Sequence, residues 1–338
     1  MERLKSSVAW RGAQYAVLLA GGGLVISLFA KPALGLDLLW NGLIPLAPAL
    51  LVVAPGLWRN LCPLATVSLL GRGERKGAEV TTGAAGALSL AGVLALVLVV
   101  PARHLILDRS GPGAALMLLS AAVAAVTMGR HFKGRGGWCT TLCPILPVAR
   151  LYGVAPARTW ENARCEKCVA CARPCPDLAG PTPLEVSSGL GWWAARVMTG
   201  GFAGFIWGFF QVDDARAPVG LFEVVEAYLW PLAGAGVSLM FHAALSRFRS
   251  MDRLFAAGAV STYYWYRLPA LAGFGLFPDS GVLMDLTGVL PPWAPLASRI
   301  VTTAFFGWFL LVRTSPRRGW LERPGARVAV CRSLAAAA

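Results

Sequence analysis

Four cysteines in one short stretch have the spacing of metal-cluster ligands. They are Cys165, Cys168, Cys171 and Cys175, and Pro176 follows directly after them. The spacing is C-x2-C-x2-C-x3-C-P, the bacterial ferredoxin pattern for a [4Fe–4S] cluster. Thiolates two residues apart in a tight loop each reach a different iron of one cubane, and the proline then turns the chain away. In two-cluster ferredoxins the last cysteine of the pattern binds the other cluster.

A zinc site and a disulfide framework are the alternatives for these four cysteines. Zinc knuckles usually pair two C-x2-C units at a longer separation than is found here. Disulfides are rare where the cytosol keeps thiols reduced, and the charge pattern of the chain places this stretch on the cytoplasmic side. The spacing therefore favours iron–sulfur ligation over both alternatives.

The other four cysteines of the chain lie outside that stretch: Cys62, Cys139, Cys143 and Cys331. Cys139 and Cys143 stand in C-x3-C-P, the spacing that ends the ferredoxin pattern, so we expect both to be cluster ligands. A complete upstream copy would carry cysteines where the chain has Lys133 and Gly136. His131, a carboxylate or a water molecule are further candidates to complete a second cluster.

Cys62 belongs to a sequence that echoes the later one. Leu61-Cys62-Pro63 matches Leu142-Cys143-Pro144, with Trp58 where the earlier cysteine of the pair would fall. The match indicates a decayed internal repeat, in which a membrane hairpin is followed by a Cys-Pro loop, twice. Cys62 is either a cluster ligand or a buried small hydrophobe, and for Cys331 the second interpretation is favoured.

The exchange of last cysteines between the clusters of two-cluster ferredoxins predicts one grouping of the thiols. Cys143 would join Cys165, Cys168 and Cys171 in the first cluster. Cys139 and Cys175 would belong to the second, with Cys62 as the better remaining candidate.

The composition shows which elements must position these thiols. Hydrophobic residues make up 56% of the 338-residue chain and charged residues only 14%, against about a quarter charged in a soluble domain. The net charge of +14 does not indicate a nucleic-acid partner, because the basic residues lie between apolar runs and form no stripe. Eight apolar runs are candidates to cross a bilayer: 13–30, 38–58, 84–100, 114–128, 192–210, 228–245, 254–274 and 294–312.

The polar, cysteine-rich segment divides these runs into two sets of four. The sequence therefore predicts an all-α polytopic membrane protein of about eight transmembrane helices, with a ferredoxin-like iron–sulfur insertion between helices 4 and 5. The predicted parts are a four-helix membrane region (1–128), an iron–sulfur segment (129–190) and a second four-helix membrane region with a basic tail (191–338). The 38–58 run contains three prolines, so we expect it to be kinked.

Lys and Arg concentrate in alternate connections between the runs, which is the pattern of cytoplasmic loops. This places both termini and the iron–sulfur segment in the cytoplasm, in a membrane of the bacterial inner (cytoplasmic) type. All eight cysteines then lie on one side, outside the apolar runs. Disulfides are not expected on that side.

The segment that begins Gly129-Arg130-His131-Phe132, continues through Trp138 to Cys143-Pro144 and ends in the ferredoxin pattern resembles the membrane-bound polyferredoxins. That family includes proteins of the NapH, NosR and CcoG types, and the resemblance covers roughly the first half of the chain. It implies electron transfer through paired [4Fe–4S] clusters between a quinone pool or partner redox protein and other centres. The chain departs from the family at Trp58, in lacking a second full ferredoxin motif, and in its four additional spans.

The sequence thus predicts an electron-relaying membrane iron–sulfur protein, or an oxidoreductase subunit, with lipid and a redox partner protein around it. The alternatives are a copper reductase or assembly factor for a respiratory enzyme, as in CcoG-like members, and a structural subunit of a larger redox complex. Arg267, which follows three tyrosines and a tryptophan, belongs either to an aromatic belt at the membrane surface or to a quinone pocket. Haem b is not expected, because only His242 of the three histidines lies within an apolar run.

Overall fold

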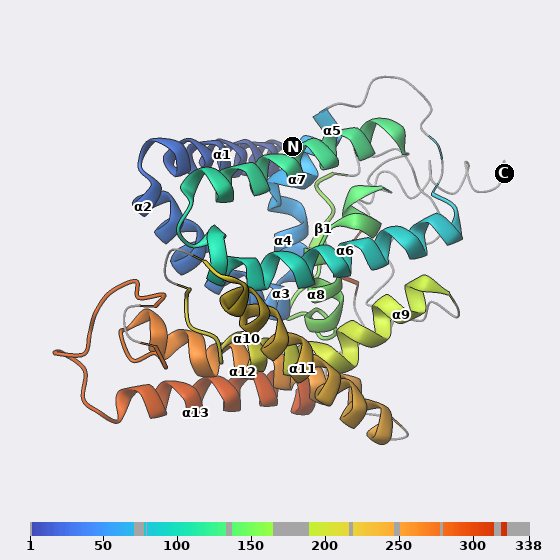
Figure 1. The fold of residues 1–338 in the computed structure, drawn as a ribbon. Coiled ribbons are helices and arrows are strands. Elements are labelled where there is room, and N and C mark those ends of the chain that lie inside the picture. The colour runs from blue at the N-terminus through green and yellow to red at the C-terminus, as the bar shows by residue number, and fades with distance from the viewer. Residues whose placement is uncertain are drawn as a thin grey trace.

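The computed structural model describes residues 2–70, 78, 80–132, 137–164, 189–215, 219–246, 251–277, 280–313 and 319–322, with side chains from residue 8 onward. Helices dominate these residues (Figure 1). The ferredoxin motif and Cys331 lie outside them.

The first half of the chain contains two helical hairpins, each followed by a short loop and a short helix. The first set is α1 (Glu2–Ala30), α2 (Pro32–Leu36), the π-helix η1 (Asp37–Leu43), α3 (Ile44–Val53), α4 (Pro55–Leu61) and α5 (Pro63–Leu70). The second set is α6 (Thr82–Ala102), the π-helix η2 (Arg103–Leu107), α7 (Gly111–His131), the π-helix η3 (Trp138–Leu142) and α8 (Ile145–Tyr152).

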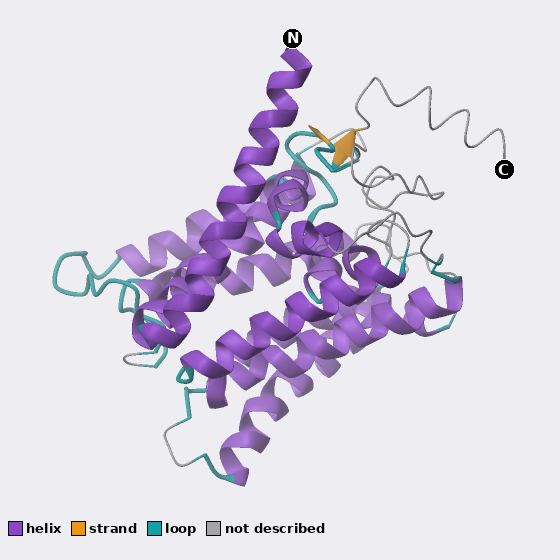
Figure 2. Cartoon of the chain, turned by 90° about the horizontal axis from the view of Figure 1, so that it is seen from above, coloured by secondary structure: helices purple, strands orange, loops and turns teal. Residues whose placement is uncertain are grey.

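The second half is a bundle of long helices. It comprises α9 (Leu190–Arg196), the π-helix η4 (Val197–Gly201), α10 (Phe202–Phe209), α11 (Leu221–Leu245), α12 (Met251–Leu271), α13 (Ala294–Gly307) and the π-helix η5 (Trp308–Val312). One small parallel sheet joins β1 (Trp160–Glu161) to β2 (Leu321–Glu322). Figure 2 shows the helices running side by side, with this sheet near the end from which α1 projects.

Prolines and capping residues set several of the helix ends. α4 and α5 both begin with proline, which tolerates the first helical turn because its missing N–H would be unpaired there. Ala54, directly before α4, has φ −140° and ψ 59° and breaks the chain from α3, since a residue before proline is pushed out of the helical region. The kink expected in 38–58 is confirmed, and it ends the second membrane helix earlier than predicted.

Six helices within the described residues are long and apolar enough to cross a membrane: Val8–Ala30, Pro32–Val53, Thr82–Leu107, Gly111–His131, Leu221–Leu245 and Ala294–Val312. Large apolar side chains point outward from them, for example Leu19, Leu98 and Val301. Such surfaces fit contact with lipid, so the chain has the features of an all-α, multi-pass membrane protein.

The two other predicted spans also form long helices, but they are less apolar. The 192–210 run is continuous through α9, η4 and α10, and the 254–274 run lies mainly in α12. Both pack against protein on several sides, because α10 contacts α11 and α12, and α12 contacts α13. The polar groups of these two helices can therefore face neighbouring helices instead of lipid.

One large core joins the two halves of the chain. It contains side chains from α3, α6, α8, α10, α12 and η5. α8, the helix that follows Cys143, is buried along most of its length, and its Tyr152 is only 1% exposed. The Cys143 loop is therefore held in place by α8, which packs into the large core directly after it.

Candidate metal centre

Cys62 and Cys143 occupy equivalent places in the two hairpin sets. Cys62 ends α4 with φ −47° and ψ 120°, and Cys143 ends η3 with φ −58° and ψ 120°. A proline follows each, and a helix of eight residues begins at or just after that proline. The internal repeat predicted from Leu-Cys-Pro is thus present in the backbone.

The structure brings Cys62, Cys139 and Cys143 to one small cavity. Its wall is formed by Trp58, Arg59, Cys62, Ala65, Trp138, Cys139, Cys143, Ile145, Leu146 and Ala149. Cys139 is 4% exposed, and the other two thiols are half-buried. The free volume of about 20 Å³ holds a water molecule or a single ion, so a cubane would require this cavity to widen.

Thiolates are soft ligands that bind zinc and iron–sulfur clusters. Within the described ranges, no group of three or more His, Cys, Asp or Glu side chains is close enough to share one metal ion. The three thiols therefore line one cavity without forming a preformed site for one ion in the described residues.

Arg59 supplies positive charge to the cavity wall. Its side chain is buried, and Nη1 donates to the Cys139 carbonyl oxygen at 2.8 Å. The guanidinium also lies over the Trp320 ring, 5.9 Å from its centroid. A fixed cation at this place stabilises negative charge on thiolates in a low-dielectric surrounding.

Arg164, the residue directly before Cys165, is anchored on the same loop as Cys62. Its Nη2 donates to the carbonyl oxygens of Asn60 and Cys62 at 2.8 and 2.9 Å. Its Nε donates to the Arg59 carbonyl at 3.3 Å, and Nη1 donates to the Thr66 hydroxyl at 2.9 Å. The chain therefore enters the ferredoxin motif from a point fixed to the wall of the cavity.

Asn60 reinforces this anchor from the α4 side. It is fully buried, its Nδ2 donates to the Glu161 carbonyl at 2.8 Å, and its Oδ1 accepts from the Ala163 amide at 3.2 Å. Gln14 of α1 donates to the Asn60 carbonyl at 3.2 Å. The approach to the motif is thus held by α1, α4 and β1 together.

Burial raises the pKa of the Cys62 thiol, and the neighbouring Cys139 adds to this effect, while Arg164 and Arg59 oppose it. Burial is also the largest cause at Cys143, whose pKa is raised to about 12, with Cys62 and Cys139 adding to it. These thiols are protonated at neutral pH without a metal. A metal that bound them would displace these protons.

The predicted ligands divide into two groups. Cys62, Cys139 and Cys143 lie together, whereas Cys165, Cys168, Cys171, Cys175 and Cys331 lie outside the described residues. The ferredoxin-type exchange separates Cys143 from Cys62 and Cys139, but the structure places all three on one cavity. His131 is exposed at the end of α7 and is not among the cavity residues.

Sequence reasoning missed Arg59, Asn60 and Arg164. Their role depends on contacts between residues about a hundred positions apart in the chain. The one local signal was a basic residue immediately before the first cysteine of the ferredoxin motif.

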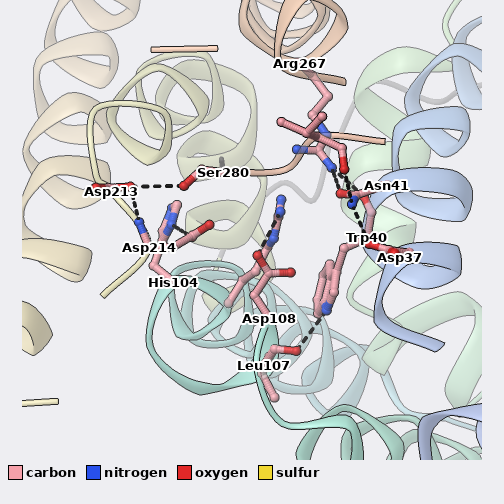
Figure 3. A network of polar contacts seen from close by, with 12 residues as sticks. Asp37, Trp40, Asn41, His104, Leu107, Asp108, Asp213, Asp214, Arg267 and Ser280 are labelled. Atoms are coloured by element: carbon pink, nitrogen blue, oxygen red, sulfur yellow. Dashed lines mark hydrogen bonds and ion pairs between the residues drawn. The ribbon is translucent and has the colours of Figure 1, made fainter. Parts of the chain in front are cut away.

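A second polar cluster lies where η1 contacts α12 and η2 contacts the loop after α10 (Figure 3). Arg267 of α12 donates through Nη2 to the Trp40 carbonyl at 2.8 Å and to Asn41 Oδ1 at 2.5 Å. His104 of η2 lies 2.7 Å from Asp214 and 3.0 Å from the Phe209 carbonyl oxygen. These bonds connect the two halves of the chain, so Arg267 is a buried clamp and not simply part of an aromatic belt.

Three other polar residues of the long helices also have partners. His242 Nε2 is 2.9 Å from Asp252. Arg196 lies over the Trp192 ring, 4.9 Å from its centroid, and Arg299 donates to the Trp265 carbonyl at 3.1 Å. Arg299 also lies over the Trp265 ring, 5.5 Å from its centroid.

Comparison with protein-family models, with curated proteins and with solved structures finds no match to this chain. The resemblance to membrane-bound polyferredoxins therefore rests on the residues that carry it, and it stays a prediction.

Proposed function

We propose that this chain is a membrane-bound iron–sulfur protein that relays single electrons between a quinone pool or a redox partner and an acceptor. One observation carries the proposal. Three cysteines from two different loops line one cavity, and Arg164 attaches the start of the ferredoxin motif to the loop that holds Cys62. In this proposal seven of the eight cysteines belong to the three cavity positions and the ferredoxin motif, and Cys331 lies in the tail.

A bound [4Fe–4S] cluster supplies one-electron redox chemistry. The residues of the chain hold the cluster, keep water away and set the surrounding charge. Cys139 and the apolar wall of the cavity exclude solvent, since Cys139 and Trp138 are 4% and 5% exposed. Buried Arg59 and Arg164 partly neutralise the negative charge of thiolate ligands, which favours the reduced state of a cluster.

The proposed topology has eight spans, with the cysteine end in the cytoplasm of a bacterial-type cell. Two features of the described residues support it. Arginines gather at the cysteine end: Arg59, Arg130, Arg158, Arg164 and Arg313. The opposite end carries five aspartates, Asp37, Asp108, Asp213, Asp214 and Asp285, beside four basic residues, Lys31, Arg103, Arg109 and Arg267. This asymmetry follows the positive-inside rule, and the lower hydropathy of the two remaining helices is explained by their packing against protein.

The protein partner in this scheme docks on the cytoplasmic face, near the clusters. A quinone is the alternative electron donor, and it would release two electrons and two protons for each quinol oxidised. The clamp joins Arg267 to Trp40 of η1, and η1 and the Cys62 loop lie beyond opposite ends of α3. A quinone that reduces the clusters is therefore expected near the cysteine end.

The proposal is tested by measuring iron, acid-labile sulfide and zinc in protein purified without oxygen. We expect iron and sulfide in about equal amounts, and a large decrease of both when Cys165, Cys168 and Cys171 are replaced by serine. Cys331→Ser is the matched control and should leave both unchanged. About one zinc per chain with no iron would overturn the proposal.

A further inference from the structure

We propose that His104 and Asp214 form a buried proton-binding site, which holds one proton at pH 7 and joins the two halves of the chain through it. His104 belongs to η2 in the first half, and Asp214 belongs to the loop after α10 in the second half. The two side chains meet in the polar cluster of Figure 3. This inference does not depend on the iron–sulfur proposal, since it concerns other residues and another ligand.

Both ring nitrogens of His104 lie next to an acceptor. Nδ1 is 2.7 Å from Asp214 Oδ1, and Nε2 is 3.0 Å from the Phe209 carbonyl oxygen. A neutral imidazole has one N–H and one lone pair, whereas the protonated ring donates from both nitrogens. A carbonyl oxygen and an ionised carboxylate can only accept. Both contacts are therefore hydrogen bonds at the same time only if the pair carries one extra proton, either on the ring or on the Asp214 carboxyl.

The His104 ring is shielded from water, so an unmade hydrogen bond is costly here. The residue is 6% exposed, and its ring packs on Phe209 with the centroids 4.3 Å apart. Without the extra proton, one ring nitrogen would direct a lone pair at an oxygen atom. A buried acceptor without a donor is destabilising. Loss of the proton should therefore weaken the contact between η2 and the loop after α10.

The second histidine–aspartate pair of the chain does not have this requirement. His242 Nε2 is 2.9 Å from Asp252, but His242 Nδ1 has no hydrogen-bond partner among the described residues. The Asp252 side chain is 69% exposed. A neutral ring that donates from Nε2 satisfies this contact, so Asp252→Asn is a matched control for changes at Asp214.

The charges around the site are paired when the ring is protonated. Arg103 forms an ion pair with Asp108 at 3.3 Å, and the protonated His104 ring forms the corresponding pair with Asp214. The last turn of α6 and the first turn of α7 add no titratable side chain. The other elements that pack against η2 or the polar cluster carry these further titratable side chains near it: Arg109, Asp37, Asp213, Glu223, Glu226, Tyr228, Tyr263 and Arg267.

Two backbone amides report on the contact. The Ala215 amide donates to the His104 carbonyl oxygen at 2.9 Å, and therefore joins the loop after α10 to η2. The Gln211 amide donates to the Gly208 carbonyl oxygen at 3.1 Å and stays within the end of α10. Hydrogen exchange at Ala215, relative to Gln211, thus measures opening of this contact separately from opening of the segment.

The proton is detected directly by nuclear magnetic resonance of the full chain with 15N-labelled histidine at pH 7. The chain has three histidines, and His131→Gln and His242→Gln assign the signals of His104 by elimination. We expect both ring nitrogens of His104 to be protonated, or a neutral ring together with a carboxylic acid band in the infrared spectrum that Asp214→Asn removes. A neutral ring without such a band would overturn the proposal.

Asp214→Asn tests whether the proton joins the two halves. The asparagine Nδ2 donates to His104 Nδ1, so a neutral ring satisfies both of its contacts. We expect a neutral His104 ring at pH 7 in this variant, and Ala215 protection that does not depend on pH. In the wild type, Ala215 protection should fall about tenfold or more as the pH rises through the value at which the histidine signals show the proton leaving.

Asp252→Asn should change neither the His104 signals nor the protection of Ala215. The coupling is refuted if wild-type Ala215 protection stays constant while the proton leaves. It is also refuted if His104 keeps both ring protons at pH 7 in Asp214→Asn, because the carboxylate would then not be part of the site. None of these results depends on iron content, so they leave the proposed function to its own test.

Discussion

Replacing Arg164 with alanine tests how the ferredoxin motif is attached to the rest of the protein. The side chain is 3% exposed and donates four hydrogen bonds, three of them to the carbonyl oxygens of Arg59, Asn60 and Cys62. A hydrogen bond to a charged group is worth about 1.5–3 kcal/mol. The contributions of four hydrogen bonds from one guanidinium do not add. We therefore take about 4 kcal/mol as the free energy that the four bonds together contribute to docking of this segment.

A loss of about 4 kcal/mol shifts the equilibrium for docking of this segment by roughly a thousandfold. Hydrogen exchange measures that shift directly, because the Thr66 amide donates to the Cys62 carbonyl in the loop that Arg164 holds. We expect protection of the amides in residues 59–66 to fall by up to that factor, if the global stability exceeds the local loss. Iron content should fall with it.

Arg158→Ala is the matched control. Arg158 lies six positions upstream on the same segment, is exposed, and stacks over the Trp160 ring 4.8 Å from its centroid. Its removal should change neither exchange nor iron content. Wild-type protection of residues 59–66 in Arg164→Ala would refute the anchoring role.

Three further predictions concern the packing and the polar clamp. Gly92→Ala should destabilise the protein by about 1–3 kcal/mol, because the added methyl group overpacks against the π-helix η3, and it should lower the iron content. Gly83→Ala is the control, since a Cβ at that position of the same helix meets nothing within 4 Å. Thermal unfolding measures the stability of each variant, and an iron assay measures its iron content. Arg267→Met should cost about 2–4 kcal/mol, because it leaves the Trp40 carbonyl and Asn41 Oδ1 without this donor in a buried place, and unfolding in detergent checks this. Burial raises the pKa of Asp214, but the hydrogen bond and charge of His104 outweigh it and leave the pKa lowered. The stability that ionised Asp214 contributes is therefore present above about pH 4 and is lost as pH falls through its lowered folded-state value. The difference in unfolding temperature between wild type and Asp214→Asn should accordingly shrink between pH 6 and pH 3, and a constant difference would contradict this assignment.

The sequence predicted the architecture well where the signal was local. Apolar length predicted long helices in all eight runs, and proline content predicted the break near Ala54. The predicted end of the second span, at residue 58, was wrong. The apolar run continues through Pro55, but the helix ends at Val53 and a new helix starts at Pro55. In the second half of the chain, hydropathy is a weaker guide to the membrane spans. Helix α12, for example, carries Arg267, whose side chain is buried where the helix packs against other helices.

The site was predictable in part. Repetition of Leu-Cys-Pro placed Cys62 and Cys143 in equivalent loops, and the structure brings them together with Cys139. From the sequence alone, Cys62 could be either a cluster ligand or a buried small hydrophobe, because the choice depends on which residues surround it in space. Arg59 and Arg164 could not be found, since their partners are carbonyl oxygens, which every residue has, on a loop distant in sequence.

The most direct test of the central proposal is a redox titration of the anaerobically purified protein, followed by electron paramagnetic resonance. We expect the spectrum of a reduced [4Fe–4S] cluster, appearing and disappearing reversibly with the one-electron dependence on potential, between about −700 and +450 mV. A protein that binds iron but shows no reversible one-electron transition in that range, or that shows no iron–sulfur spectrum at any potential, would contradict the relay of electrons by this chain.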